Sequence, residues 1–264
     1  MTSPVLLDVV DGVATLTLNR PEALNALSFE MMEALSEATA QLSRRDDLRV
    51  VVVTGAGNHF MAGGDLKDFA GQLHLSPESR IATFRATIEQ HINRSVEAFA
   101  ALRVPVIARV QGFAIGGGCV LAVACDFRFS SDKGRFGIPI AKFGFMLSPI
   151  DTVRLAKLVG LSQARRLLMS GAVIDAEEAH RIGLVDRVVP LAELDAAVSA
   201  FATLLAQNAP LSLKATKQML AAFHIREPSI GDAAALYREL YSSADLGEGL
   251  DAFFEKRPPR FRGA

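Results

Sequence analysis

Gln111-Gly-Phe-Ala-Ile-Gly-Gly-Gly-Cys119 is the most informative stretch of this 264-residue chain. It follows residues 104–110, a continuous apolar run that is typical of a strand buried on both faces. Residues 119–125 after it favour a short apolar helix. Glycines at such a junction let the backbone approach a ligand closely, and a helix N-terminus adds partial positive charge. The stretch therefore predicts a strand, a turn and a helix that together can bind an oxygen that becomes negative.

A second glycine cluster, Ala62-Gly63-Gly64-Asp65, also follows an apolar strand-like stretch. The nearby run of residues 48–54 has strand length and ends at Gly55-Ala-Gly57. This region is no Walker loop, because no Gly-Lys-Ser or Gly-Lys-Thr follows, and Phe60 stands where a dinucleotide-binding turn needs glycine. One backbone N–H from each glycine cluster would make an oxyanion hole, often the largest single catalytic contribution in acyl chemistry.

The pattern of the whole chain predicts an α/β fold. Strands alternate with helices up to about residue 190, which argues for βαβ units with a mostly parallel sheet. Asp11-Gly12 predicts a hairpin between residues 5–10 and 13–18. We expect a core of residues 1–190 and a helical region of residues 191–264. The other expected elements are helices at 28–43, 76–102 and from 175, and strands at 127–130 and 185–189.

Composition excludes several classes of function. The net charge is −1, so nothing favours nucleic acid or an anionic membrane as the main partner. Cys119 and Cys125 fit buried, reduced thiols better than a disulfide framework or a metal site. Residues 1–4 show no signal-peptide pattern, and the apolar run 113–125 is shorter than the ~20 residues of a membrane span. We therefore expect a cytoplasmic enzyme without a nucleic-acid or membrane partner.

Several motifs occur in an order typical of one family. They are Leu18-Asn-Arg-Pro-Glu-Ala-Leu-Asn-Ala-Leu27, Phe60-Met-Ala-Gly-Gly-Asp-Leu-Lys67, the stretch 111–119, Ala179-His-Arg-Ile-Gly-Leu-Val185 and Phe253-Phe-Glu-Lys-Arg257. Through them nearly the whole chain resembles the crotonase superfamily, the enoyl-CoA hydratase/isomerase family. The resemblance implies a spiral of ββα units with a helical C-terminal trimerisation region. It also implies assembly as a homotrimer or as a dimer of trimers.

The resemblance further implies a coenzyme A thioester as substrate and no prosthetic group. The N–H groups of Gly64 and Gly117 would form the oxyanion hole for the thioester. Other positions would line the CoA path, or would reach the CoA of a neighbouring subunit in the case of Tyr237 and Lys256. From the residues alone, a solvated surface charge explains Lys256 nearly as well. The implied CoA-binding residues are Ala23, Leu24, Ala62, Asp65, Leu66, Lys67, Tyr237 and Lys256.

The chain departs from the family pattern at two positions. Hydratases of the family place one glutamate two residues after the glycine triplet and a second one twenty residues later. This chain has Val120 and Ile140 there, and neither side chain can carry a proton. General acid–base catalysis is typically worth ~10²–10⁴-fold, so the standard two-glutamate hydration is not expected. Isomerisation of a double bond needs one proton shuttle, so we expect isomerisation or other non-standard acyl-CoA chemistry.

Two groups of polar residues are candidate acids or bases. Ser148 occupies a position where some relatives have aspartate, and Asp151 lies one helical turn beyond it. The pair could shuttle a proton, but Ser148-Pro-Ile-Asp151 also matches a helix cap with proline at the first helical position, and no partner for Asp151 is evident. Glu89 and Asn93 share a face of the predicted helix beside His91, which favours the polar side of an amphipathic helix.

Three other functions stay open. A non-catalytic acyl-CoA binder would use Val120 and Ile140 to make an apolar slot. A hydratase would need an unusual acid or base. A partner-binding role without a thioester is the third, because fold does not fix function, although the glycines at 63–64 and 116–118 argue against it.

Overall fold

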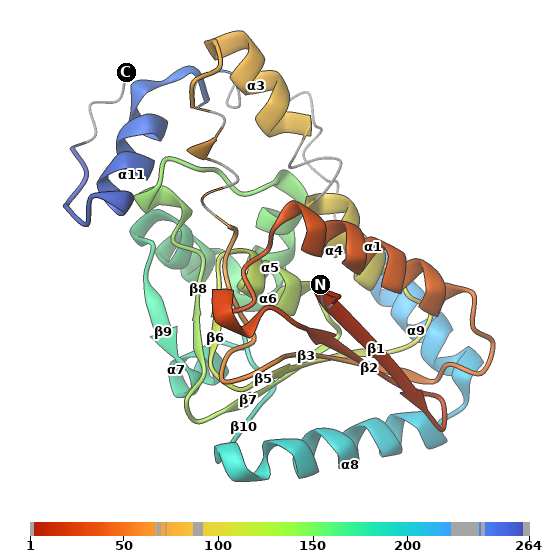
Figure 1. Cartoon of the computed structure of the whole chain (residues 1–264). Helices are drawn as coiled ribbons and strands as arrows, with labels where there is room; N and C mark the ends of the chain where they lie inside the picture. The colour runs from red at the N-terminus through yellow and green to blue at the C-terminus, as the bar shows by residue number, and fades with distance from the viewer. Residues whose placement is uncertain are drawn as a thin grey trace.

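The computed structural model describes residues 3–65, 67, 70–71, 73–86, 92–222, 238 and 241–260. Its larger sheet has the strand order β1-β2-β3-β5-β7-β10 (Figure 1). β1 and β2 are antiparallel and every other neighbouring pair is parallel, which confirms the mostly parallel sheet. The strands are β1 (Val5–Val10), β2 (Val13–Leu18), β3 (Val50–Gly55), β5 (Val106–Val110), β7 (Phe127–Ser131) and β10 (Arg187–Val189).

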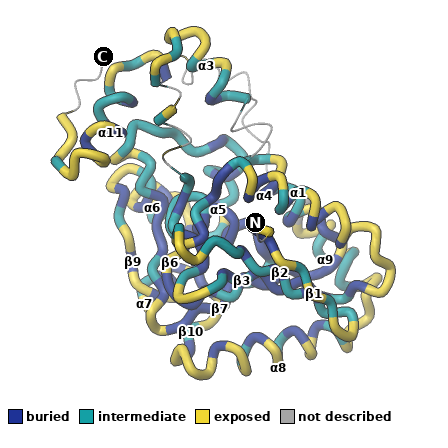
Figure 2. Tube along the Cα trace, viewed as in Figure 1, coloured by how far each residue is buried: buried dark blue, intermediate teal, exposed yellow. Residues whose placement is uncertain are grey.

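Helices cover both faces of this sheet, which explains its continuous apolar runs. In β3, Val51 and Val53 point into the main core, which is shared with α1 (Phe29–Ser43). Val50 and Val52 point the other way and join the cluster under α8 (Leu194–Gln207). Figure 2 shows buried strands between these two layers of helix. Alternate side chains of one strand are therefore buried on opposite faces, as a sandwiched parallel strand requires.

A second sheet, which the sequence pattern did not predict, carries the glycine turns. It has the order β4-β6-β8-β9, and its strands are only two or three residues long. Strands so short leave no alternation of apolar and polar side chains to detect. They are β4 (Met61–Ala62), β6 (Phe113–Ile115), β8 (Arg135–Gly137) and β9 (Val173–Asp175).

The predicted helices are confirmed with two corrections. The short helix of the glycine motif, α5 (Gly117–Ala124), begins within the glycines rather than at residue 119. Where one helix was expected over residues 76–102, the structure describes α3 (Pro77–Ala86) and α4 (Arg94–Ala100), with residues 87–91 outside the described part. The other helices are α6 (Pro149–Ser170), α7 (Ala176–Arg181), α9 (Pro210–Ala222) and α11 (Ala244–Phe254), with 3-10 turns Pro21–Ala23, Ile140–Lys142 and Leu191–Glu193.

The helical C-terminal region packs against the rest of the chain through α8 and α11, and Lys217 of α9 forms an ion pair with Asp126. α8 completes the core on one face of the larger sheet. α11 packs with α3 in a separate apolar cluster, at the top of Figure 1. The boundary at residue 190 stays a prediction. Within the described residues no single helix is long and apolar enough to cross a membrane, although the bent pair Leu191–Gln207 and Pro210–Leu220 passes on length and composition.

Candidate active site

The two glycine clusters lie side by side because the strands before them are paired. β4 and β6 run parallel with Met61 opposite Ala114 and Ala62 opposite Ile115. The glycines that follow each strand are therefore neighbours across the end of the sheet. An added Cβ on Gly116 would lie 3.3 Å from the Cα of Gly63, so the two turns are in van der Waals contact. The predicted meeting of the two clusters is confirmed.

The backbone around Gly64 directs its N–H away from the neighbouring segment. Gly63 O accepts a hydrogen bond from Leu27 N at 2.8 Å, and Asp65 N donates to Leu27 O at 3.0 Å. Successive N–H groups of an extended chain point to opposite sides, so the Gly64 N–H points away from Leu27. It has no acceptor among the described residues.

The N–H of Gly117 is left unpaired by its place at a helix start. Gly116 caps α5 with φ 54° and ψ −120°, a left-handed conformation that suits glycine. Its own N–H donates to Gly137 O at 2.8 Å, and its carbonyl accepts from Val120 N at 3.0 Å. The first N–H groups of a helix have no partner within it, and no other described residue accepts from Gly117. The N–H groups of Gly64 and Gly117 thus both lack an acceptor among the described residues.

Both turns open into one cavity of about 330 Å³. Gly64 and Gly117 line it, and so do Val120 and Ile140, the two positions where the family pattern breaks. Most of the remaining wall is aliphatic or aromatic, including Ile138, Phe143, Phe145, Met146 and Phe253. Asp151 is the one ionisable side chain that the described residues contribute to the wall. The cavity therefore suits an apolar group held next to two N–H donors and one carboxyl group.

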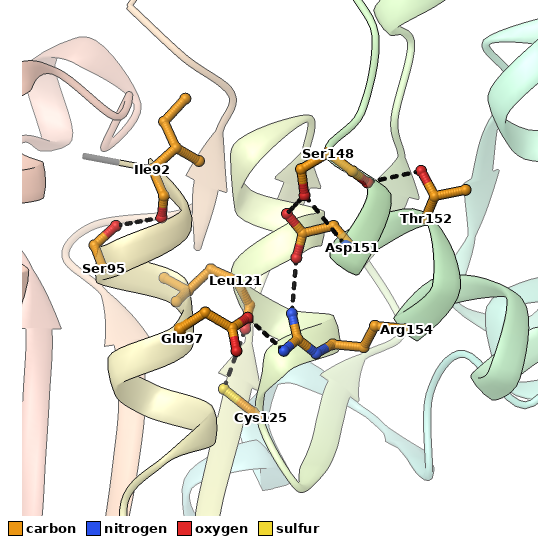
Figure 3. Close-up of polar contacts among 9 residues, drawn as sticks. All are labelled: Ile92, Ser95, Glu97, Leu121, Cys125, Ser148, Asp151, Thr152 and Arg154. Atoms are coloured by element: carbon orange, nitrogen blue, oxygen red, sulfur yellow. Dashed lines mark hydrogen bonds and ion pairs between the residues drawn. The ribbon is translucent and has the colours of Figure 1, made fainter. Parts of the chain in front are cut away.

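Ser148 and Asp151 are both buried and joined by hydrogen bonds (Figure 3). Ser148 Oγ donates to Asp151 Oδ2 at 2.6 Å and accepts from Asp151 N at 3.2 Å. The second bond makes Ser148 the N-cap of α6, as one of the two interpretations predicted. The first bond keeps the pair together at the cavity wall. The Ser148 hydroxyl group therefore caps α6 and binds the Asp151 carboxyl group at the same time.

Asp151 does have a charged partner, which corrects the expectation from the sequence. Its Oδ1 accepts from Arg154 Nη1 at 2.7 Å, and Arg154 Nη2 pairs with Glu97 Oε1 at 2.5 Å (Figure 3). Burial nevertheless raises the pKa of Asp151 above its ordinary value, against the opposing effects of Ser148 and Arg154. A carboxyl group with a raised pKa can take up and return a proton more readily.

Sequence reasoning missed Arg154 and Glu97 because the ion pair spans 57 residues of chain. Arg154 has one weak local signal, its i+3 spacing from Asp151. Asn93, predicted on the polar side of a helix, lines the cavity instead, and its Oδ1 has no hydrogen-bond partner among the described residues. Glu89 and His91 lie outside the described residues.

Four of the residues implied for CoA binding lie close together. Leu24 O accepts from Ala62 N at 3.0 Å, which places the turn of Ala23 and Leu24 beside β4. Asp65 pairs with Arg20 at 3.2 Å on the same side of the chain. Leu66 and Tyr237 lie outside the described residues, Lys67 is exposed, and Lys256 is exposed just after α11. The roles of these residues stay predictions.

The motif of residues 18–27 holds this turn in place. Asn25 is fully buried with φ 57°, and its Oδ1 accepts from Arg20 N at 2.9 Å. Its Nδ2 donates to Ala56 O and His59 O, each at 2.9 Å. Gln111 Nε2 also donates to His59 O, at 3.0 Å. The buried amides tie the loop before β4 to the turn, which fixes the first glycine cluster.

Comparison with known proteins gives a consistent picture. Residues 8–264 match the enoyl-CoA hydratase/isomerase family. A probable enoyl-CoA hydratase of Mycobacterium tuberculosis is 35% identical over 97% of each chain. An (E)-benzylidenesuccinyl-CoA hydratase of Thauera aromatica is 36% identical over 99% of this chain and 100% of that one.

A solved structure supports the same assignment. An enoyl-CoA hydratase/carnithine racemase from Magnetospirillum magneticum superposes with a TM-score of 0.79 at 32% identity, over 100% of this chain and 97% of that one. The agreement confirms the predicted crotonase-type α/β fold. By sequence, by fold and by its paired glycine turns, this chain belongs to the enoyl-CoA hydratase/isomerase family.

Proposed function

We propose that this acyl-CoA enzyme transfers one proton between two carbon atoms of its substrate. The enolate formed on the way is bound by the N–H groups of Gly64 and Gly117. The supporting observation is the cavity, where two unpaired amides, an apolar wall and a single described carboxyl group meet. Two donors aimed at one oxygen stabilise the charge that develops on a thioester carbonyl when a neighbouring C–H bond breaks. With Val120 and Ile140 apolar, one acid–base group serves both halves of the reaction.

The reaction that fits one such group is migration of a double bond. Ionised Asp151, directly or through the Ser148 hydroxyl, removes a proton from the α-carbon of a 3-enoyl thioester. The electron pair moves onto the carbonyl oxygen, where the Gly64 and Gly117 amides bind it. The same proton then returns to the γ-carbon, and the 2-enoyl thioester forms with no net gain or loss of atoms. Arg154 holds the other carboxylate oxygen, so Asp151 keeps one orientation throughout.

The substrate would enter along the turn of residues 23–24. We propose that Ala23, Leu24, Ala62, Asp65, Leu66 and Lys67 line the CoA path of one subunit. Tyr237 and Lys256 would reach the CoA of a neighbouring subunit in a homotrimer or dimer of trimers. No prosthetic group enters this chemistry, because proton transfer and charge stabilisation are supplied by side chains and backbone.

Hydration is the second candidate, and the names of the relatives favour it. The Mycobacterium and Thauera proteins are both named as hydratases. In this chain hydration would need Asp151 to activate the water, with Ser148 completing the relay.

Kinetics with two substrates tests the proposal. Purified protein is mixed with 3-hexenoyl-CoA or with crotonyl-CoA, and the absorbance of the conjugated thioester is followed. Isomerisation raises the signal with the first substrate, and hydration lowers it with the second. We expect the rise to dominate and to fall by about 10²–10⁴-fold in Asp151→Asn, the usual loss when an acid–base group is removed.

Asp47→Asn is the matched control, because Asp47 is an exposed aspartate that also pairs with an arginine, Arg45. It should leave both rates unchanged. Dominant loss of the crotonyl-CoA signal would replace isomerisation by hydration. Binding of acyl-CoA by calorimetry without any turnover would establish a non-catalytic binder instead.

A further inference from the structure

Two cavities share one pair of aromatic rings in their linings. The cavity of the candidate active site is about 330 Å³, and a second cavity beside it is about 340 Å³. Among the described residues, Phe143 and Phe253 are the two that line both. Their rings meet edge to face, with centroids 5.4 Å apart and planes at 71°. We refer to this pair as the aromatic partition.

The backbones that carry the two rings are in direct contact. A Cβ added to Gly249 of α11 would lie 2.7 Å from the carbonyl carbon and oxygen of Phe143. A Cβ added to Gly144, which has φ +70°, would lie 3.1 Å from Leu246 Cα. Both elements have a glycine at the contact, so the main chain of α11 packs directly against the main chain of residues 143–144. The backbones that carry the two rings are therefore held close together.

The end of α11 beside Phe253 is also tied back to the helix. Arg257 Nη1 and Nη2 donate to Glu248 Oε1 and Oε2 at 2.6 and 2.9 Å. Arg257 Nε bonds to Glu255 at 2.5 Å. This guanidinium lines the second cavity with its charge already matched by two carboxylates. Lys142 and Ser170 add polar groups to the lining of the second cavity, and Met169, Ala252 and Pro259 add apolar surface.

We propose that the aromatic partition sets the maximum length of the acyl group. The second cavity, whose lining shares the two rings, takes up the distal part of a longer alkyl chain once a ring is removed. This inference rests on the proposed acyl-CoA function. Its physical basis is that a packed apolar wall excludes extra methylene groups, each of which typically changes discrimination by ~10–200-fold.

Binding across a series of chain lengths tests the inference, whichever reaction is catalysed. The dissociation constants of butanoyl-, octanoyl- and dodecanoyl-CoA are measured by calorimetry for the wild type, Phe253→Ala and Phe143→Ala. We expect the affinity ratio of dodecanoyl-CoA to butanoyl-CoA to rise by about tenfold or more in each variant. Phe253 is 49% exposed, so its truncation should leave the fold intact, which thermal unfolding checks.

Phe254→Ala is the matched control. Phe254 is 45% exposed and its ring touches Phe253, yet it lines neither cavity. Its chain-length profile should equal that of the wild type. In the Phe253→Ala background, Ala141→Trp places an indole into the second cavity. It should cancel the increased relative affinity for dodecanoyl-CoA. If that increase came from a general loosening of the protein, Ala141→Trp would not cancel it.

The outcomes separate the two proposals. A wild type that binds none of the three acyl-CoAs overturns the proposed function. Butanoyl-CoA binding with the same length profile in Phe253→Ala, Phe143→Ala and wild type overturns the partition alone. A gain that survives Ala141→Trp also overturns it, because the added chain would then lie elsewhere.

Discussion

The surroundings of Asp151 combine a local motif, the helix cap at Ser148, with an ion pair between Arg154 and a residue far away in the sequence. The spacing of Asp151 from Ser148 predicted the cap, and the structure confirms that bond. What the spacing could not supply is the Arg154–Glu97 pair that holds the other oxygen, because α4 and α6 are far apart in the chain. The glycines were predictable since their conformation is local, whereas a charge network depends on which helices pack together.

The raised pKa of Asp151 makes a prediction for stability. Because this pKa exceeds the ordinary value of 3.8, the folded protein holds the proton more tightly than the unfolded chain. The resulting contribution to stability is fully present below pH 3.8 and is lost as the pH rises through the raised pKa. Asn cannot titrate, so the free energy of unfolding of Asp151→Asn relative to wild type should increase with pH over that window.

Urea unfolding of both proteins, between about pH 4 and pH 7, measures this difference. Asp47→Asn serves again as the control, because the Arg45 hydrogen bond lowers the pKa of the exposed Asp47. Its contribution is complete about one pH unit above the ordinary value, so the Asp47→Asn difference should be flat above about pH 5. Equal pH dependence of Asp151→Asn and wild type would show that the buried carboxyl group has no raised pKa.

At the scale of elements, long buried strands and capped helices were predictable and the second sheet was not. The run of valines in β3 identifies a strand by itself. β4 has only two residues, and its pairing with β6 depends on Asn25 and Gln111 tying down the loop before it. The element that positions the first glycine cluster therefore exists through tertiary contacts, which no local pattern encodes.

Two glycines in α11 should respond in opposite ways to alanine. Gly249 packs on the backbone of Phe143, where a Cβ would approach to 2.7 Å, so Gly249→Ala should cost about 1–3 kcal/mol through overpacking. Gly247 lies two residues earlier in the same helix with nothing within 4 Å of an added Cβ. Gly247→Ala should stabilise by roughly 0.5–1 kcal/mol, because alanine is the better helix former.

Thermal unfolding measures both changes, since 1 kcal/mol shifts Tm by about 2–4 °C in a chain of this size. Each glycine controls for the other, because both variants make the same chemical change in one helix. A Gly249→Ala variant as stable as wild type would mean that α11 can move away from the loop, and the aromatic partition would then not be rigid.

At the scale of the whole molecule, the motifs predicted the family because five of them, spread from residue 18 to residue 257, occur in one order. Their agreement with the fold is strong because each reports on a different part: a turn, two glycine sites, α7 and the end of α11. The reaction is less predictable, because it depends on a few side chains inside the cavity. The reaction depends on Val120, Ile140 and Asp151, and the rest of the fold is compatible with either isomerisation or hydration.

Self-association is the prediction that belongs to this scale. The C-terminal region exposes large apolar side chains, with Leu211 at 77% and Met219 at 66% on α9. They are eight residues apart and so share one helix face, and an apolar stripe on one face of a helix is the pattern by which helices pack against a partner. We expect light scattering to give about three or six times the chain mass of 28.3 kDa.

Variants test whether this helix face forms the interface. The mass of the double variant Leu211→Lys, Met219→Lys should fall toward that of a single chain. Leu161→Lys, at a 58% exposed position on α6 outside this region, should keep the assembly. A wild type with the mass of one chain would mean that Tyr237 and Lys256 have no neighbouring CoA to reach, and the CoA site would then have to be complete within a single subunit.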